Sequence, residues 1–136
     1  SIEALDIGFK PRAVKLLAEL NMELAKSGYV AKIVETYRSP ARQAYLWGIG
    51  RLYQAPGRTG IVTKIRDVSG KHPQRKAFDV AYYRADGIYV GSDEVEKKVA
   101  PAIAKFVGRL ESTYNVSWGG NWKGNFRDYP HYEDRS

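Results

Sequence analysis

The sequence predicts an α+β fold in a single domain, with a small antiparallel sheet flanked by about three helices. Segments with helical spacing and segments rich in β-branched and aromatic residues are mixed along the chain, without the regular strand–helix alternation of a parallel sheet. A turn at Asp86-Gly87 joins two strand-like segments directly, which is typical of antiparallel pairing. The length of 136 residues, with no linker-like segment, fits one domain over residues 1–136.

The first half of the chain predicts two helices and one strand before a long loop. Pro11 at an early helical position and Gly28 as a stop delimit the first helix, with Leu17, Leu20 and Leu24 along one face. The elements that follow are a strand over residues 29–38, a helix over 39–53 that begins at Ser39 and Pro40, and a glycine- and proline-rich loop over 54–75.

The second half predicts a hairpin, an interrupted helix and two short strands. Residues 76–83 form a strand that pairs with 85–92 through the turn at Asp86-Gly87. Pro101 kinks or splits the helix that follows, because proline lacks the backbone N–H that an interior position needs. The apolar residues of this helix recur at helical spacing, at Val95, Val99, Ile103, Phe106 and Leu110. Short strands over 116–122 and 129–134 follow it.

The composition excludes several kinds of site chemistry but leaves several classes of binding partner open. The chain has no cysteine, so disulfides and thiolates are excluded and any metal must be held by His, Asp or Glu. No apolar run has the length of about 20 residues that spans a bilayer, and the N-terminus has no signal-peptide pattern. The net charge of +7 favours polyanions: nucleic acid, acidic membranes and anionic cell-wall polymers all qualify.

The only two histidines, His72 and His131, are candidate metal ligands together with Asp79. A catalytic zinc site uses three such ligands and an open position for water. Asp79 shares its strand face with Ala77 and Ala81, whose small side chains leave space around the carboxylate. Spacing alone also allows the alternative that the two histidines are unrelated residues at the surface or at the edge of the core.

Two acids lie close to His131 in the sequence, Asp128 three residues before it and Glu133 two residues after it. A zinc hydrolase needs a carboxylate near the metal to take a proton from water and return it to the leaving amine. Asp128 is a candidate for that role. The alternative is that the segment is a charged, fraying C-terminus.

Four motifs in order resemble the M15 zinc peptidases, which comprise D-alanyl-D-alanine carboxypeptidases and dipeptidases and phage L-alanyl-D-glutamate endopeptidases. The family signature is Ser-x-His-x-x-Gly-x-Ala-x-Asp followed by a distant Asp/Glu-x-x-His. "KHPQRKAFD" matches its His, Ala and Asp positions, and "DYPH" matches the second motif. "TYRSPARQAYLWGIGR" and "WGGNW" are similar to two further family segments. The resemblance extends from about Tyr29 to Glu133.

The resemblance implies a role for each matching residue. His72, Asp79 and His131 would bind Zn²⁺, and Asp128 would be the general base. Arg38 would be both catalytic and substrate-binding, because it steadies the developing negative charge on the substrate, and Gln43 would line the same pocket. A strand-end salt bridge is the alternative for Arg38. Glu133 is expected to orient a ligand or the base. Trp118 and Trp122 are expected to have packing roles.

The sequence departs from the signature in one loop. Arg75 stands where the family has glycine, and Gly70 stands where it has serine. We interpret the family glycine as a site of close backbone packing, so that Arg75 predicts a reshaped loop and a changed substrate preference.

The leading hypothesis is a zinc-dependent peptidoglycan peptidase that acts as a phage or prophage endolysin on the L-alanyl-D-glutamate bond of the stem peptide. Alternatives are a D-alanyl-D-alanine carboxypeptidase of the same fold, a non-catalytic cell-wall-binding module, and a small basic nucleic-acid binder. We expect no nucleic-acid partner, because no reading helix or RNA-binding strand motif is present. We also expect a monomer made in the host cytoplasm that acts on the cell wall or periplasm after release.

Overall fold

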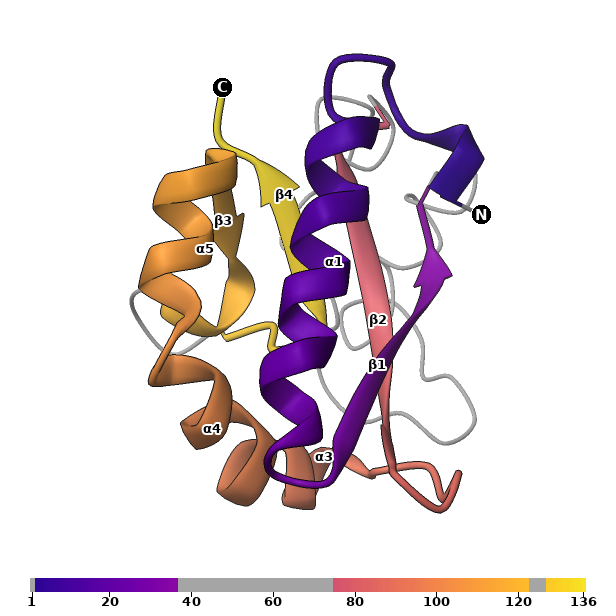
Figure 1. The fold of residues 1–136 in the computed structure, drawn as a ribbon, viewed down its shortest axis with the longest axis vertical. Coiled ribbons are helices and arrows are strands. Elements are labelled where there is room, and N and C mark those ends of the chain that lie inside the picture. Colours follow the sequence, from indigo (N-terminus) through magenta and orange to yellow (C-terminus); the bar gives the residue numbers. More distant parts are fainter. Residues whose placement is uncertain (1, 37–74, 123–126) are drawn as a thin grey trace, which may run out of the picture.

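A computed structural model describes residues 2–36, 75–122 and 127–136 (Figure 1). Four strands form one antiparallel sheet in the order β1-β2-β4-β3, and helices cover one of its faces, which confirms the predicted α+β class. The strands are β1 (Tyr29–Glu35), β2 (Ala77–Arg84), β3 (Val116–Trp118) and β4 (His131–Asp134). The helical elements are η1 (Ile2–Ala4), α1 (Lys10–Ala25), α3 (Ser92–Glu94), the π-helical turn η2 (Val95–Val99), α4 (Ala100–Ala104), α5 (Val107–Tyr114) and η3 (Gly119–Asn121).

Helix α1 lies across the sheet and supplies one side of the core (Figure 1). Its fully buried side chains recur every three or four residues, which is the spacing of one helix face. The face centres on Leu16, Leu20 and Leu24, whereas Leu17, which we had placed on it, is only partly buried. Gly28 follows with φ of +82°, a left-handed conformation that glycine adopts readily, and so ends the helical segment as predicted.

Strand β2 lies between β1 and β4 and separates two environments. Phe78, Val80 and Tyr82 are buried in the core cluster that α1 covers. Asp79 and Ala81 alternate with them and therefore point to the opposite face. The predicted sharing of one face by Asp79 and Ala81 is thus confirmed by the alternation of burial.

The predicted hairpin forms after β2. Gly87 has φ of +91° and donates a backbone hydrogen bond to the Arg84 carbonyl at 2.9 Å, which closes the turn. The returning segment pairs with β2 through a bridge between Tyr83 and Tyr89. Glycine is required in this turn because a side chain strains a positive φ.

The predicted helix around Pro101 is distorted before the proline and interrupted after it. A π-helical turn ends at Val99, and the backbone stays right-handed helical through Val99 and Ala100 to Pro101. The helix then breaks at Lys105 and Phe106, which separate α4 from α5. The predicted helix over 39–53 and all but the last residue of the predicted loop over 54–75 lie outside the described residues. None of the described helices is long and apolar enough to cross a membrane.

Candidate metal centre

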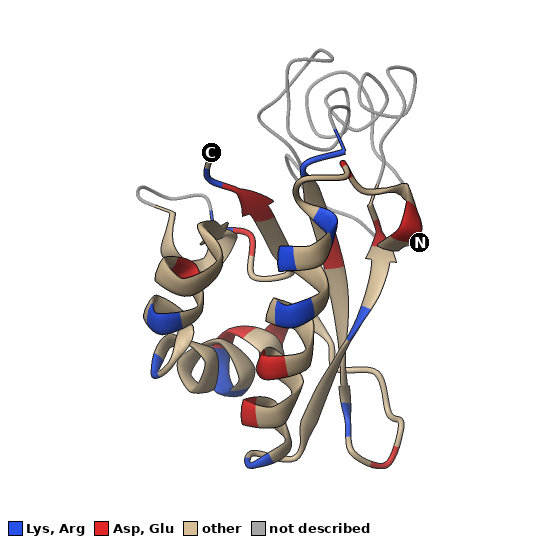
Figure 2. Cartoon of the chain, turned by 45° about the horizontal axis from the view of Figure 1, so that its top comes forward, with Lys and Arg blue, Asp and Glu red and all other residues tan. Residues whose placement is uncertain are grey.

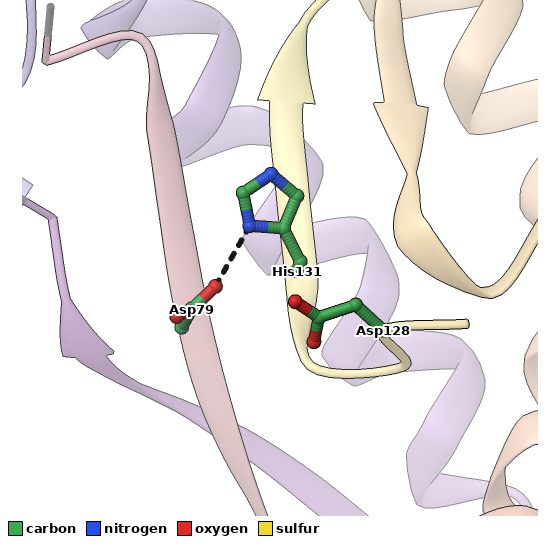
Figure 3. Close-up of side chains that lie close together, drawn as sticks. All are labelled: Asp79, Asp128 and His131. Carbon is green, nitrogen blue, oxygen red and sulfur yellow. Dashed lines mark hydrogen bonds and ion pairs between the residues drawn. The ribbon is translucent and has the colours of Figure 1, made fainter. Parts of the chain in front are cut away.

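The register between β2 and β4 brings two of the predicted ligands together. Asp79 and His131 are direct partners across this antiparallel pair, and both side chains point away from α1 (Figure 3). Asp79 Oδ1 lies 3.0 Å from His131 Nδ1. Two residues separated by 51 others therefore meet because of strand pairing, which residue spacing alone could not establish.

The second ring nitrogen of His131 contacts Glu133, the next residue on the same face of β4. Glu133 Oε1 lies 2.8 Å from His131 Nε2, and the imidazole is 8% exposed. Burial by itself lowers the pKa of His131, but hydrogen bonds with Asp79 and Glu133 outweigh it and raise the pKa to about 9. The imidazole is therefore fixed in orientation by one carboxylate at each nitrogen.

Asp128 precedes β4 in a tight turn that positions its carboxylate beside this pair. The His131 N–H donates to the Asp128 carbonyl at 3.1 Å, and the Asp128 N–H donates to the Gly119 carbonyl at 3.1 Å. A side chain at position 119 would place its Cβ only 2.1 Å from the Asp128 carbonyl oxygen. Gly119 is thus a residue on which the site depends, and only its place in "WGGNW" hinted at this from the sequence.

Two buried tyrosines support the same turn from the core side. The Tyr82 hydroxyl donates to the Tyr129 carbonyl at 2.7 Å and lies 2.8 Å from the Tyr132 hydroxyl. Burial raises the pKa of both phenols, so they stay neutral. Trp118 Nε1–H also donates to the Tyr129 carbonyl, at 2.8 Å. These bonds hold the segment that carries Asp128 and were not foreseen from the sequence.

The expected packing roles of the two tryptophans are confirmed. Trp118 is 2% exposed and belongs to the core. The Trp122 ring lies against the imidazole of His131, with 5.1 Å between ring centroids. Trp122 therefore covers one side of the candidate centre.

Asp79, Asp128 and His131 together can offer three ligand atoms within 4.8 Å of one another. Figure 3 shows the three side chains converging from β2, β4 and the turn before β4. Figure 2 shows acidic segments on β2, on β4 and in the turn before β4. Three carboxylates, with Glu133 included, surround one imidazole, and this excess of negative charge and donor set fits a divalent metal such as zinc.

The remaining predicted site residues, His72, Arg38 and Gln43, lie outside the described residues. Arg75, the first described residue after His72, has φ of +62°. This is the left-handed region that glycine adopts without strain, so a glycine at this position would suit the conformation. The close packing expected of the family glycine stays a prediction. Arg75 retains the glycine-like conformation, and the rest of the loop lies outside the described residues.

Comparison with known proteins identifies the family and a similar fold. A family model for the M15 peptidases, described as D-alanyl-D-alanine carboxypeptidase, matches residues 66–134, which is just over half of the chain. The crystal structure of the L-Ala D-Glu endopeptidase ChiX from Serratia marcescens is similar in fold, with a TM-score of 0.59. The two are 22% identical over 97% of this chain and 81% of that one. The chain therefore belongs to the M15 family of peptidoglycan-directed metallopeptidases.

Proposed function

We propose that the protein is a zinc-dependent peptidase that hydrolyses the L-alanyl-D-glutamate bond of the peptidoglycan stem peptide. The observation that carries the proposal is the convergence of Asp79, Asp128 and His131 within 4.8 Å. In a family of metallopeptidases, a buried imidazole and two carboxylates at this separation can hold a metal and still leave an acid for proton transfer.

His72, Asp79 and His131 are the proposed zinc ligands. When bound, zinc acts as a Lewis acid that polarises the scissile carbonyl and lowers the pKa of water. With zinc bound, Nε2–H of His131 would donate to Glu133, 2.8 Å away, and Nδ1, which lies 3.0 Å from Asp79, would be the nitrogen that binds the metal. This is the orienting role expected of Glu133, because a carboxylate that binds one nitrogen of the imidazole leaves the other nitrogen as the ligand.

Asp128 is the proposed general base and acid. Its carboxylate takes a proton from the attacking water and delivers it to the leaving amine, a transfer worth about 10²- to 10⁴-fold in rate. The hydrogen bonds around Asp128 and Tyr129 fix the backbone that carries it. Arg38 would steady the negative charge that develops on the substrate, and Gln43 would line the same pocket.

The choice of the L-alanyl-D-glutamate bond rests on the similarity in fold to the ChiX endopeptidase. The basic charge of the chain supports the cell wall as the target. Seven basic residues and one acidic residue fall between positions 37 and 74, so this segment favours anionic wall polymers. We propose action as a phage or prophage endolysin, made as a monomer in the host cytoplasm and acting on the wall after release. The family description favours one alternative, a D-alanyl-D-alanine carboxypeptidase.

The test is digestion of purified sacculi by the zinc-loaded protein, with mass spectrometry of the new termini. New N-terminal D-glutamate supports the endopeptidase, whereas release of free D-alanine supports the carboxypeptidase. Asp128→Asn should lower the rate about 10²- to 10⁴-fold with the fold retained. Asp93→Asn is the matched control, because Asp93 is an exposed acid on α3 outside the centre.

Two outcomes would contradict the proposal. Activity that survives a strong chelator would exclude the metal mechanism. Binding to sacculi without any cleavage, by a protein that contains stoichiometric zinc, would instead favour a non-catalytic wall-binding module.

A further inference from the structure

A cleft of about 530 Å³ adjoins the candidate metal centre, and Asp128 belongs to both. The cleft lies beside β2, on the side where β4 ends and the segment that contains Val90 takes its place next to the strand. The Pro130 carbonyl accepts a hydrogen bond from Val80 N–H, and farther along the strand the Tyr82 carbonyl accepts one from Val90 N–H. A substrate cut beside Asp128 therefore places a part close to the scissile bond in this cleft.

Two side chains of opposite charge line the cleft without pairing with each other. Glu96, an exposed residue of η2, makes no hydrogen bond or ion pair within the described ranges 2–36, 75–122 and 127–136. Arg127 donates one hydrogen bond to the Gly120 carbonyl at 2.9 Å, and no carboxylate of the same ranges forms an ion pair with it. Each charge is thus available to a ligand.

Apart from Ser92 and the Asp128 carboxylate, the rest of the lining is apolar or aromatic. Val90 and Val95 are buried at the wall of the cleft, and Tyr89 is 64% exposed at its rim. Such walls accommodate an aliphatic chain, while a carboxylate such as Glu96 attracts an ammonium group and a guanidinium such as Arg127 binds a carboxylate through two parallel hydrogen bonds. The matching chemistry is an aliphatic residue whose side chain ends in both an ammonium group and a carboxylate.

We infer that this cleft selects a diamino dicarboxylic acid residue of the substrate peptide, with Glu96 binding its side-chain ammonium group and Arg127 its side-chain carboxylate. The inference rests on the proposed function, since it assigns a substrate residue to the same site. It makes Glu96 and Arg127 specificity-determining residues and leaves the proton transfer to Asp128.

The experiment measures binding of a peptide that contains no scissile bond. The zinc-loaded full chain is titrated calorimetrically with the dipeptide γ-D-glutamyl-diaminopimelate and with two modified forms. One form has the side-chain amine acetylated and the other has the side-chain carboxylate amidated. In the unaltered protein, each modification should weaken binding about three- to tenfold.

The variants assign each effect to one residue. Glu96→Gln should no longer distinguish the acetylated dipeptide from the parent, and Arg127→Gln should no longer distinguish the amidated one. Each variant should retain discrimination against the other modification. Asp93→Asn and Arg135→Gln, which change exposed charges outside the cleft, should behave like the unaltered protein. If Arg127→Gln fails to fold, Glu96→Gln still tests the assignment, because Glu96 has no contact of these kinds to lose within the described residues.

Failure of this inference is separable from failure of the proposed function. Equal affinity for the three dipeptides, absence of binding, or unchanged discrimination in both variants would overturn the role of the cleft, even if sacculi are cleaved. The expected pattern of binding with no cleavage of sacculi would support the cleft and overturn the peptidase activity.

Discussion

The two faces of β4 differ in how their polar groups are balanced. Toward α1, Tyr132 stacks on Phe78 with 5.3 Å between ring centroids, and buried Asp134 forms an ion pair with Arg12 at 2.9 Å. On the opposite face, the single imidazole of His131 contacts two carboxylates. The face toward α1 pairs its charges within the fold, whereas the other face has surplus negative charge that a metal can offset.

This comparison shows why the register of β4 is decisive. Side chains alternate along a strand, so a shift of one residue would exchange the two sets and point His131 into the core. Pairing of Phe78 with Tyr132 and of Asp79 with His131 occurs in the same register. The apolar contact thus stabilises the arrangement that the site requires, and substitutions on the two faces should have separable effects.

The largest expected effect on stability comes from Tyr132→Ala. The substitution removes a fully buried ring from its stack on Phe78 and a hydroxyl from Tyr82, and should cost about 3 to 5 kcal/mol of the free energy of unfolding. Tyr132→Phe keeps the ring and should cost only about 1 kcal/mol, because the Tyr82 hydroxyl retains the Tyr129 carbonyl. Urea unfolding measures both. Equal losses would show that the hydroxyl, and not the aromatic stack, fixes this face.

Asp134→Asn should remove a pH-dependent contribution from the same face. Burial raises the pKa of Asp134, but hydrogen bonds from Arg12 and Ser136 outweigh it and lower the pKa to about 2. A carboxyl with a lowered folded-state pKa contributes stability above its unfolded pKa of about 3.9, and the contribution is lost as pH falls toward 2. The difference in unfolding free energy between the two proteins should be about 2 kcal/mol at neutral pH and should shrink across that window. A difference that does not change with pH would exclude the ionised pair as its source.

Glu133→Gln addresses the opposite face of β4. The carboxylate accepts from His131 Nε2 and is partly exposed, and the glutamine amide can still accept there, so the unfolding free energy of the apoprotein should fall by only about 1 kcal/mol. Zinc affinity should fall about tenfold, because the neutral amide accepts a weaker hydrogen bond from the ring than the carboxylate does and fixes the ligating nitrogen less firmly. Competition with a chromophoric chelator measures this, and the exposed Asp93→Asn variant is the control. A variant with full affinity would show that Asp79 and the metal orient the ring without help.

Local features could be predicted from the sequence, because neighbouring residues determine them. The turn at Asp86-Gly87 and the alternation around Asp79 follow from backbone preference and strand geometry. Pro101 likewise predicts a divided helix, although the position of the π-helical turn before it depends on packing. Within α1 the buried face includes Leu16 and not Leu17, because packing against the sheet determines which side of the helix is buried.

The geometry of the site could not be predicted from local sequence, because it depends on contacts between segments that lie far apart in the chain. Nothing in the local sequence says that β4 pairs with β2, so the contact between Asp79 and His131 followed from resemblance alone. Gly119 is needed only because the Asp128 carbonyl approaches it in the folded chain. The partners of Tyr82 arise in the same way from segments remote in sequence. Tertiary contacts of this kind have no signature in a single local stretch.

The smallest expected effect concerns the residue at the entry to β2. Arg75 and Asn115 both adopt left-handed conformations, with φ of +62° and +53°. Asparagine tolerates this region at the end of a helix, whereas arginine is strained there by contact of its Cβ with the backbone. Arg75→Gly should therefore raise the free energy of unfolding by about 1 kcal/mol, the relieved strain exceeding the added entropy of the unfolded chain. Asn115→Gly should change it by only a few tenths of a kcal/mol. Urea unfolding distinguishes the two, and a loss of stability in Arg75→Gly would mean that interactions of the arginine side chain outweigh its backbone strain.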